Sequence, residues 1–174
     1  VITPDLNFVQ INDDDNIACE MTNIKNGDSQ IRYYAFEVIH GKDMRMEIAN
    51  DIIANSKLGD ILKVKVELVS DTGNDLLYEG LLKNLATEHT ILKNANNQTT
   101  VYYKVTITAD GLTEDYCNLE LNATLHWSLR ETSEKLEVTN NTFKSYTKPV
   151  VPPEPPVITP DLNFVQINDD DNIA

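Results

Sequence analysis

The sequence predicts an all-β fold, a jelly-roll-like or immunoglobulin-like antiparallel β-sandwich, and three observations support this. Apolar and polar residues alternate with a period of two over long stretches, as in strands that bury one face. Turns that contain glycine or asparagine separate these stretches. Residues 1–18 return unchanged as residues 157–174, after a proline-rich segment. The chain of 174 residues is long enough for one domain with a full hydrophobic core.

Each expected strand follows from this alternation. It is cleanest in residues 99–109, where Val101, Tyr103, Val105 and Ile107 share one face, and it recurs in residues 62–68 and 118–130. Further strands are predicted at residues 6–11, 18–22, 30–40, 43–49 and 76–79. Residues 81–86 and 112–116 could each form a helical turn. Turns that tolerate positive φ are expected around Gly27, Gly41 and Gly73.

The chain divides into three parts. Residues 1–146 form the sandwich domain, in which 1–18 supply a first strand and an acidic turn. Residues 147–156 hold five prolines in ten positions and favour an extended polyproline spacer of about 30 Å. Residues 157–174 are the copy of 1–18, either a donor strand or the start of a next repeat. Three origins remain open: a tandem array, an engineered copy that complements the fold, and a strand that a neighbouring subunit supplies.

Charge and hydropathy narrow the classes of partner. The formal net charge of −14 argues against nucleic acid and against an anionic membrane surface, because both need clustered lysine and arginine. No apolar run approaches the roughly 20 residues of a membrane span. No signal peptide is present, so an exported protein would be seen here in its mature form. We expect an extracellular, cell-surface protein.

Several segments resemble the TasA/camelysin family of secreted proteins. Asn23, Gly27 and Asp28 match that family's N-x-x-P-G-D turn, and Gly41 stands at its second turn. Residues 58–66 and 77–81 are similar to its L-x-D-x-L-x-V-x-V and L-Y-x-G-x-L patterns, and residues 116–121 to its closing strand. The resemblance covers roughly residues 5–130. It implies a jelly-roll-like, fibre-forming protein of biofilm matrix, in which one subunit's terminal strand completes its neighbour's sheet.

Catalysis is not expected, although camelysin-type members are described as metalloproteases. A zinc protease needs an H-E-x-x-H helix. The three histidines, His40, His89 and His126, are all more than five residues apart. We expect His40, at a turn, and His126, on a polar strand face, to be solvated. There is also no G-x-S-x-G elbow, so a camelysin-like secreted metalloprotease is only a remote alternative.

A calcium site and a disulfide are two further possibilities, and each has a simpler alternative. The acidic turn offers clustered oxygens that could hold Ca²⁺ through Asp13 and Asp15, or through Asp169 and Asp171 in the copy, but it lacks the pattern of an EF-hand. An acidic turn without metal is the other interpretation, and no cofactor is expected. Cys19 and Cys117 could form a disulfide outside the cell or could be two buried thiols.

The duplicated segment is the main functional candidate, a strand-exchange interface. Its apolar residues are Leu6, Phe8, Val9 and Ile11, repeated as Leu162, Phe164, Val165 and Ile167. Such a strand could pair with an open sheet edge of a neighbour, or it could only be the first strand of its own sandwich. The predicted function is a structural subunit of an extracellular fibre, with copies of itself as partners. A stalk repeat of a cell-surface adhesin is the alternative.

Overall fold

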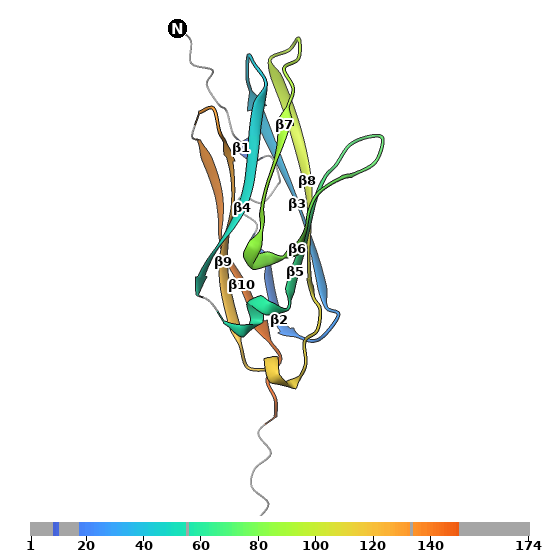
Figure 1. Ribbon diagram of the computed structural model, residues 1–174, viewed down its shortest axis with the longest axis vertical. Helices are drawn as coiled ribbons and strands as arrows, with labels where there is room; N and C mark the ends of the chain where they lie inside the picture. Colours follow the sequence, from blue (N-terminus) through green and yellow to red (C-terminus); the bar gives the residue numbers. More distant parts are fainter. Residues whose placement is uncertain (1–8, 11–17, 55, 133, 150–174) are drawn as a thin grey trace, which may run out of the picture.

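Alternating side chains bury one face of each long strand, and the two buried faces pack together as a β-sandwich (Figure 1). The computed structural model describes residues 9–10, 18–54, 56–132 and 134–149. Within these residues the sandwich has two sheets of five strands each. The fold class predicted from the sequence is therefore confirmed.

The first sheet has the order β1-β3-β8-β5-β6, and all of its pairs are antiparallel. Its strands are β1 (Val9–Gln10), β3 (Ser29–Ile39), β5 (Leu62–Leu68), β6 (Asp75–Leu81) and β8 (Gln98–Ala109). The centre is the pair β3–β8, which is in register from Ser29↔Thr108 to Ile39↔Gln98. β1 pairs with the other edge of β3.

The second sheet has the order β2-β10-β9-β4-β7. Its strands are β2 (Glu20–Ile24), β4 (Met44–Ala54), β7 (Ala86–Ile91), β9 (Glu120–Leu129) and β10 (Lys135–Ser145). One pair differs from the predicted antiparallel sandwich, because β2 runs parallel to β10. Three short 3-10 helices join strands, and they are η1 (Lys57–Asp60), η2 (Leu82–Asn84) and η3 (Glu114–Tyr116). The last two fall within the predicted helical turns.

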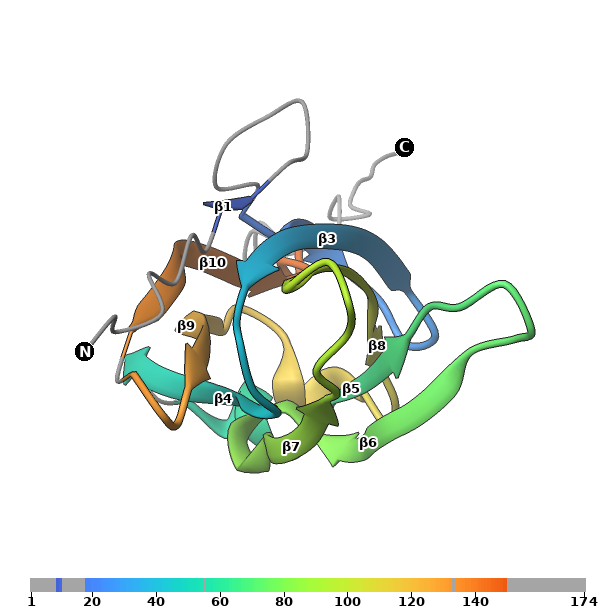
Figure 2. The ribbon, with the colours of Figure 1, turned by 90° about the horizontal axis from the view of Figure 1, so that it is seen from above.

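An aromatic cluster fills the space between the sheets. The ring of Trp127, from β9, lies 4.9 Å from Tyr34 and 5.0 Å from Phe36, both from β3, and 6.0 Å from Tyr103 of β8. All four side chains are at most 1% exposed. Viewed along the long axis, β3, β8, β5 and β6 lie along one side and β10, β9, β4 and β7 along the other (Figure 2).

The first described strand lies near one end of the sandwich, and the last described strand ends at the other. We name the end at Ile39 and Gln98 the N pole, and the end at Gly27 and Ala109 the C pole. β1 runs antiparallel to β3 and so points from the N pole to the C pole. β10 runs parallel to β2, which ends at the C pole, so β10 also ends there (Figure 1).

Candidate strand-pairing site

The duplicated segment meets the described structure at β1. Val9 lies opposite Glu37 and Gln10 lies opposite Phe36, near the N-pole end of β3. The remaining predicted exchange residues lie outside the described residues: Leu6, Phe8, Ile11, Leu162, Phe164, Val165 and Ile167. The predicted calcium candidates Asp13, Asp15, Asp169 and Asp171 also lie outside them. The first copy thus supplies at least a short edge strand to its own sandwich.

The inner side of this site is firmly packed. Tyr34, Phe36 and Val38 point into the core and are at most 1% exposed. Phe36 touches Trp127 on one side and lies 5.9 Å from the ring of Tyr103 on the other. A strand that pairs with β3 here therefore meets a backbone that the aromatic core holds in place.

The outer side of β3 is apolar beside the same position. Ala35 lies opposite Tyr102 of β8 and is only 6% exposed. Ile31, Tyr33 and Tyr102 are 44%, 54% and 48% exposed. These large side chains share the outer face, because residues two apart on a strand point the same way. The outer face of β3 thus combines apolar side chains with Glu37, the residue opposite Val9.

His40 fixes the N-pole end of β3, and the prediction that it is solvated is wrong. Its side chain is fully buried. Its Nδ1 lies 2.7 Å from the carbonyl oxygen of Lys42, and its Nε2 lies 2.8 Å from the hydroxyl of Thr99. Since a carbonyl only accepts, Nδ1 carries the proton and Nε2 accepts from Thr99. Its backbone N–H also donates to Asn97, so the β3–β4 and β7–β8 turns close over the imidazole.

Cys19 lies where the chain joins the second sheet. Its thiol donates to Oε1 of Gln30 at 2.8 Å, and its backbone N–H donates to Oδ1 of Asn141 at 2.8 Å. Burial raises the pKa of the Cys19 thiol to about 11, although the charge of Arg32 lowers it. The thiol is thus protonated at neutral pH and is a structural group rather than a nucleophile.

The disulfide that the sequence allowed is not formed, since Cys19 and Cys117 are both free thiols. The carbonyl of Cys19 accepts from Thr142, whereas the neighbour of Cys117, Asn118, donates to the carbonyl of Tyr146. Thr142 and Tyr146 are four positions apart along an extended stretch, which separates them by about 13 Å. A disulfide needs Cα atoms within about 7 Å.

At the C pole, hydrogen bonds hold the chain as it leaves the sandwich. The backbone N–H of Tyr146 donates to Ile24 at 3.0 Å, and its carbonyl accepts from Asn118 at 2.9 Å. Beyond it, Nζ of Lys148 lies 2.9 Å from a carboxylate oxygen of Glu114. The start of the proline-rich segment therefore lies at the C pole, whereas β1 lies near the N pole.

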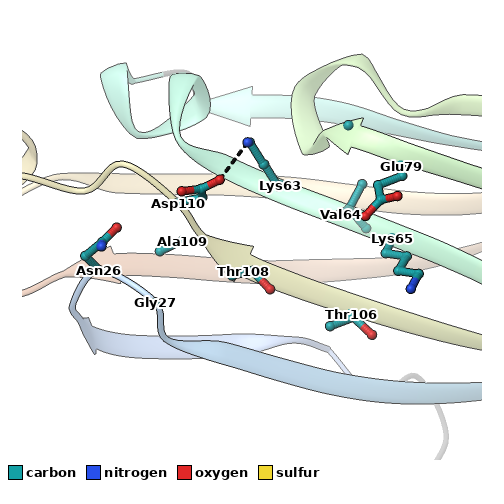
Figure 3. Close-up of a pocket in the computed structure, with 11 residues that line it drawn as sticks. Asn26, Gly27, Lys63, Val64, Lys65, Glu79, Thr106, Thr108, Ala109 and Asp110 are labelled. Carbon is teal, nitrogen blue, oxygen red and sulfur yellow. Dashed lines mark hydrogen bonds and ion pairs between the residues drawn. The ribbon is translucent and has the colours of Figure 1, made fainter.

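A surface depression lies on the outer face of the first sheet, towards the C pole (Figure 3). It has a volume of about 540 Å³. Lys63 from β5 pairs with Asp110 at 2.7 Å across it. Oδ1 of Asn26 is already occupied by the backbone N–H groups of Gly111 and Leu112. Its lining contains no serine, cysteine or histidine.

The three histidines lie in separate environments. His89 points between the sheets, where its Nε2 is 2.5 Å from the hydroxyl of Tyr103. His126 lies on the outer face of the second sheet near Asp51, but its side chain is only 16% exposed, so it is less solvated than predicted. Within the described ranges no three metal-ligating side chains gather as a metal site. No helix in this part of the chain could cross a membrane.

Comparison with known proteins adds little to this geometry. No protein-family model matches the chain, and no curated protein matches its sequence. Among solved structures it is similar to AvmM, described as catalysing macrocyclization in alchivemycin A biosynthesis, at 8% identity and a TM-score of 0.37, over 83% of this chain and 92% of that one. It is also similar to ACE19, the collagen-binding subdomain of the Enterococcus faecalis surface protein ACE, at 8% identity and a TM-score of 0.32, over 81% and 97% of the two chains. Such distant likenesses carry no argument about function.

Proposed function

We propose that this protein is a structural subunit of an extracellular fibre, joined head to tail by the second copy of its first strand. The observation that carries the proposal is the direction of the chain. β1 runs from the N pole to the C pole along β3, and the chain leaves at the C pole towards an identical copy of β1. The resemblance to the TasA/camelysin family agrees with a secreted fibre protein.

Strand direction favours a neighbouring subunit as the acceptor. If the next subunit lies beyond the C pole in the same orientation, the copy arrives at its N pole already running the way β1 runs. Pairing with its own β3 would require the copy to travel back along a strand of eleven residues, roughly 35 Å, and then to reverse. The proline-rich spacer spans about 30 Å, so it would not cover that return by itself.

Protein concentration should decide whether β3 pairs with its own first copy or with the second copy of a neighbour. The two copies have the same sequence, so we expect a donated copy to make the same contacts with β3 as the first copy does. The choice between the chain's own β1 and a neighbour's copy then depends on effective concentration rather than on contact quality. Assembly should therefore increase with protein concentration, and it should increase further when the first copy is removed.

A covalent array is the second candidate, because the same direction of the chain suits a tandem repeat in an adhesin stalk. In that case residues 157–174 are simply the first strand of the next domain. The stiff linker would set the spacing between domains. The isolated chain would then remain a monomer, which separates the two functions.

The proposal is tested with three chains: the full chain, a chain ending at residue 156, and a chain in which residues 157–174 are scrambled at constant composition. We expect the full chain to form oligomers that grow with concentration in light-scattering measurements. The other two should be monomers with an unchanged thermal midpoint, because their sandwich is intact. A scrambled chain that assembles as well as the full chain would reject strand donation.

A further inference from the structure

Three asparagines of this sequence begin an Asn-x-Thr tripeptide, the acceptor pattern for an N-linked glycan. They are Asn97, Asn122 and Asn140. A chain rich in asparagine and threonine contains such tripeptides by chance, and the surroundings of each side chain distinguish them. An acceptor needs a side chain that reaches solvent and an amide nitrogen that the fold does not use, because the glycan is attached to that nitrogen.

The fold restricts Asn122 and Asn140, which both lie in the second sheet. Asn122 is half-buried; its Oδ1 accepts from the hydroxyl of Thr142 at 3.1 Å, and its Nδ2 donates to a carboxylate oxygen of Glu120 at 3.1 Å. A glycan on this nitrogen would disturb both bonds. Asn140 is exposed, but the next residue, Asn141, is 1% exposed, and its side-chain amide makes three hydrogen bonds to backbone groups. The middle of this tripeptide is therefore fixed inside β10.

Asn97 lies in the turn between β7 and β8, within a run of exposed residues, 92–98. Its φ is 53°, a conformation that asparagine adopts more readily than most residues. Its carbonyl accepts from the backbone N–H of His40 at 2.8 Å, and its own N–H donates to the carbonyl of Asn94 at 3.2 Å. Its side-chain amide makes no hydrogen bond to another described residue. The fold thus uses the backbone of Asn97 and leaves its amide nitrogen available.

This turn lies at the N pole, but β3 separates it from β1. Ile39, the last residue of β3, pairs with Gln98, the residue after Asn97. β1 pairs with the opposite edge of β3, where Val9 lies opposite Glu37. Since neighbouring strands are about 5 Å apart, β1 and β8 are about 10 Å apart across β3. A glycan on Asn97 would therefore leave the strand-pairing edge of β3 open.

We propose that Asn97 is an N-glycosylation site. The inference rests on the proposed function, because N-linked glycans are added to secreted chains. In the reaction, Nδ2 of Asn97 forms a bond to C1 of a sugar, and the bond between C1 and the diphosphate oxygen of a polyprenyl-linked oligosaccharide breaks. The amide nitrogen gives up one proton, polyprenyl diphosphate leaves, and nothing is oxidised or reduced. The membrane across which the chain is exported supplies the donor and the transferase.

The test compares variants of the full chain, isolated from the native host. N97D keeps the shape of the side chain and tolerates the same φ, but it has no amide nitrogen to modify. N96D is the matched control, because Asn96 is also exposed and the change adds the same charge, but it begins no acceptor tripeptide. We expect the intact mass to exceed that of the polypeptide in the wild type and in N96D, and to equal it in N97D. Peptide mass spectrometry should find sugar only on the peptide that contains Asn97.

An Asn97 without sugar in the wild-type chain would overturn the inference. The peptide measurement decides this on the wild type, so the result holds even if N97D folds poorly. Scrambling residues 157–174 tests strand donation separately. If Asn97 carries sugar and assembly ignores the scramble, the proposed function fails and the glycosylation site stands. If assembly needs the copy and Asn97 carries no sugar, only this inference fails.

Discussion

His89 and Tyr103 join the two sheets: Nε2 of His89 on edge strand β7 lies 2.5 Å from the hydroxyl of Tyr103 on β8. The rings meet edge to face with centroids 5.5 Å apart. Tyr103 is fully buried, and burial raises its pKa, so its hydroxyl stays protonated and donates to the imidazole. Burial also lowers the pKa of His89, which keeps the ring neutral.

This contact predicts an acid-sensitive sandwich. The pKa of His89 is below its ordinary value of about 6.5 in the folded protein. The unfolded chain therefore binds the proton more readily, and stability declines as pH falls below about 6.5 until the folded ring also titrates. We expect H89Q, which accepts from Tyr103 but does not titrate, to lose less unfolding free energy than the wild type between pH 7.5 and 5.

Tyr103→Phe provides the control for this prediction. It removes the hydrogen bond but leaves a titrating imidazole, so we expect lower stability, by about 1–3 kcal/mol, with the acid sensitivity retained. Chemical denaturation at the two pH values measures both quantities. Equal acid sensitivity in the wild type and H89Q would show that His89 is not the group responsible.

The buried side-chain amide of Asn141 links β10 to β9 and to Cys19, the residue before β2. Its Nδ2 donates to Val138 at 2.8 Å and Ala123 at 3.1 Å, and its Oδ1 accepts from the backbone of Cys19 at 2.8 Å. We expect Asn141→Ala to lower the unfolding free energy by about 2–4 kcal/mol, because buried backbone groups lose their partner. Thr139→Ala, at an exposed neighbour, should stay within about 0.5 kcal/mol. Similar effects for the two variants would contradict this role.

An irregularity in the pairing of β10 with β9, just before Asn141, explains why β10 could not be predicted from the sequence. Buried positions run through Val138 and then shift phase to Asn141 and Phe143, because the register with β9 slips between Val138 and Asn141. A test for strict alternation does not detect a strand whose phase changes in the middle. Asparagine at a buried position weakens the signal further.

Polar residues at inward positions account for the other differences. β7 was missed because two of its three inward residues, Thr87 and His89, are polar and only Ile91 is aliphatic. β4 was predicted to end at residue 49, but it continues to Ala54 with Asn50 buried inside. His40 was predicted to be solvated because a turn residue is usually exposed, and only the fold brings the β7–β8 turn over it. Strands with aliphatic inward faces, such as β8, were predicted almost to the residue.

The turn at the C pole gives a further prediction. Oδ1 of Asn26 accepts from Gly111 at 2.8 Å and from Leu112 at 3.0 Å. We expect Asn26→Ala to cost about 1–2 kcal/mol, because both N–H groups lose this acceptor. Asn26→Asp keeps an acceptor oxygen in place and should cost less. Thermal unfolding of the two variants compares them, and a larger loss for the aspartate would contradict the assignment.

Removal of the first copy tests the competition between strands. A chain that begins at residue 18 has no β1 of its own, so β3 can accept only the copy at 157–174. We expect it to assemble at lower concentration than the full chain, as measured by sedimentation velocity. A folded monomer at all concentrations would indicate that the copy does not pair between chains.

The most direct measurement of strand donation is a disulfide between two chains. Val9 lies opposite Glu37, so the equivalent Val165 of a donated copy should also lie opposite Glu37, within disulfide reach. One chain carries V165C and the other E37C, both with Cys19 and Cys117 replaced by alanine, and they are mixed under mild oxidation. The account predicts a covalent heterodimer, and no such product with Y33C in place of E37C. No heterodimer, in conditions where V9C and E37C in one chain join readily, would contradict it.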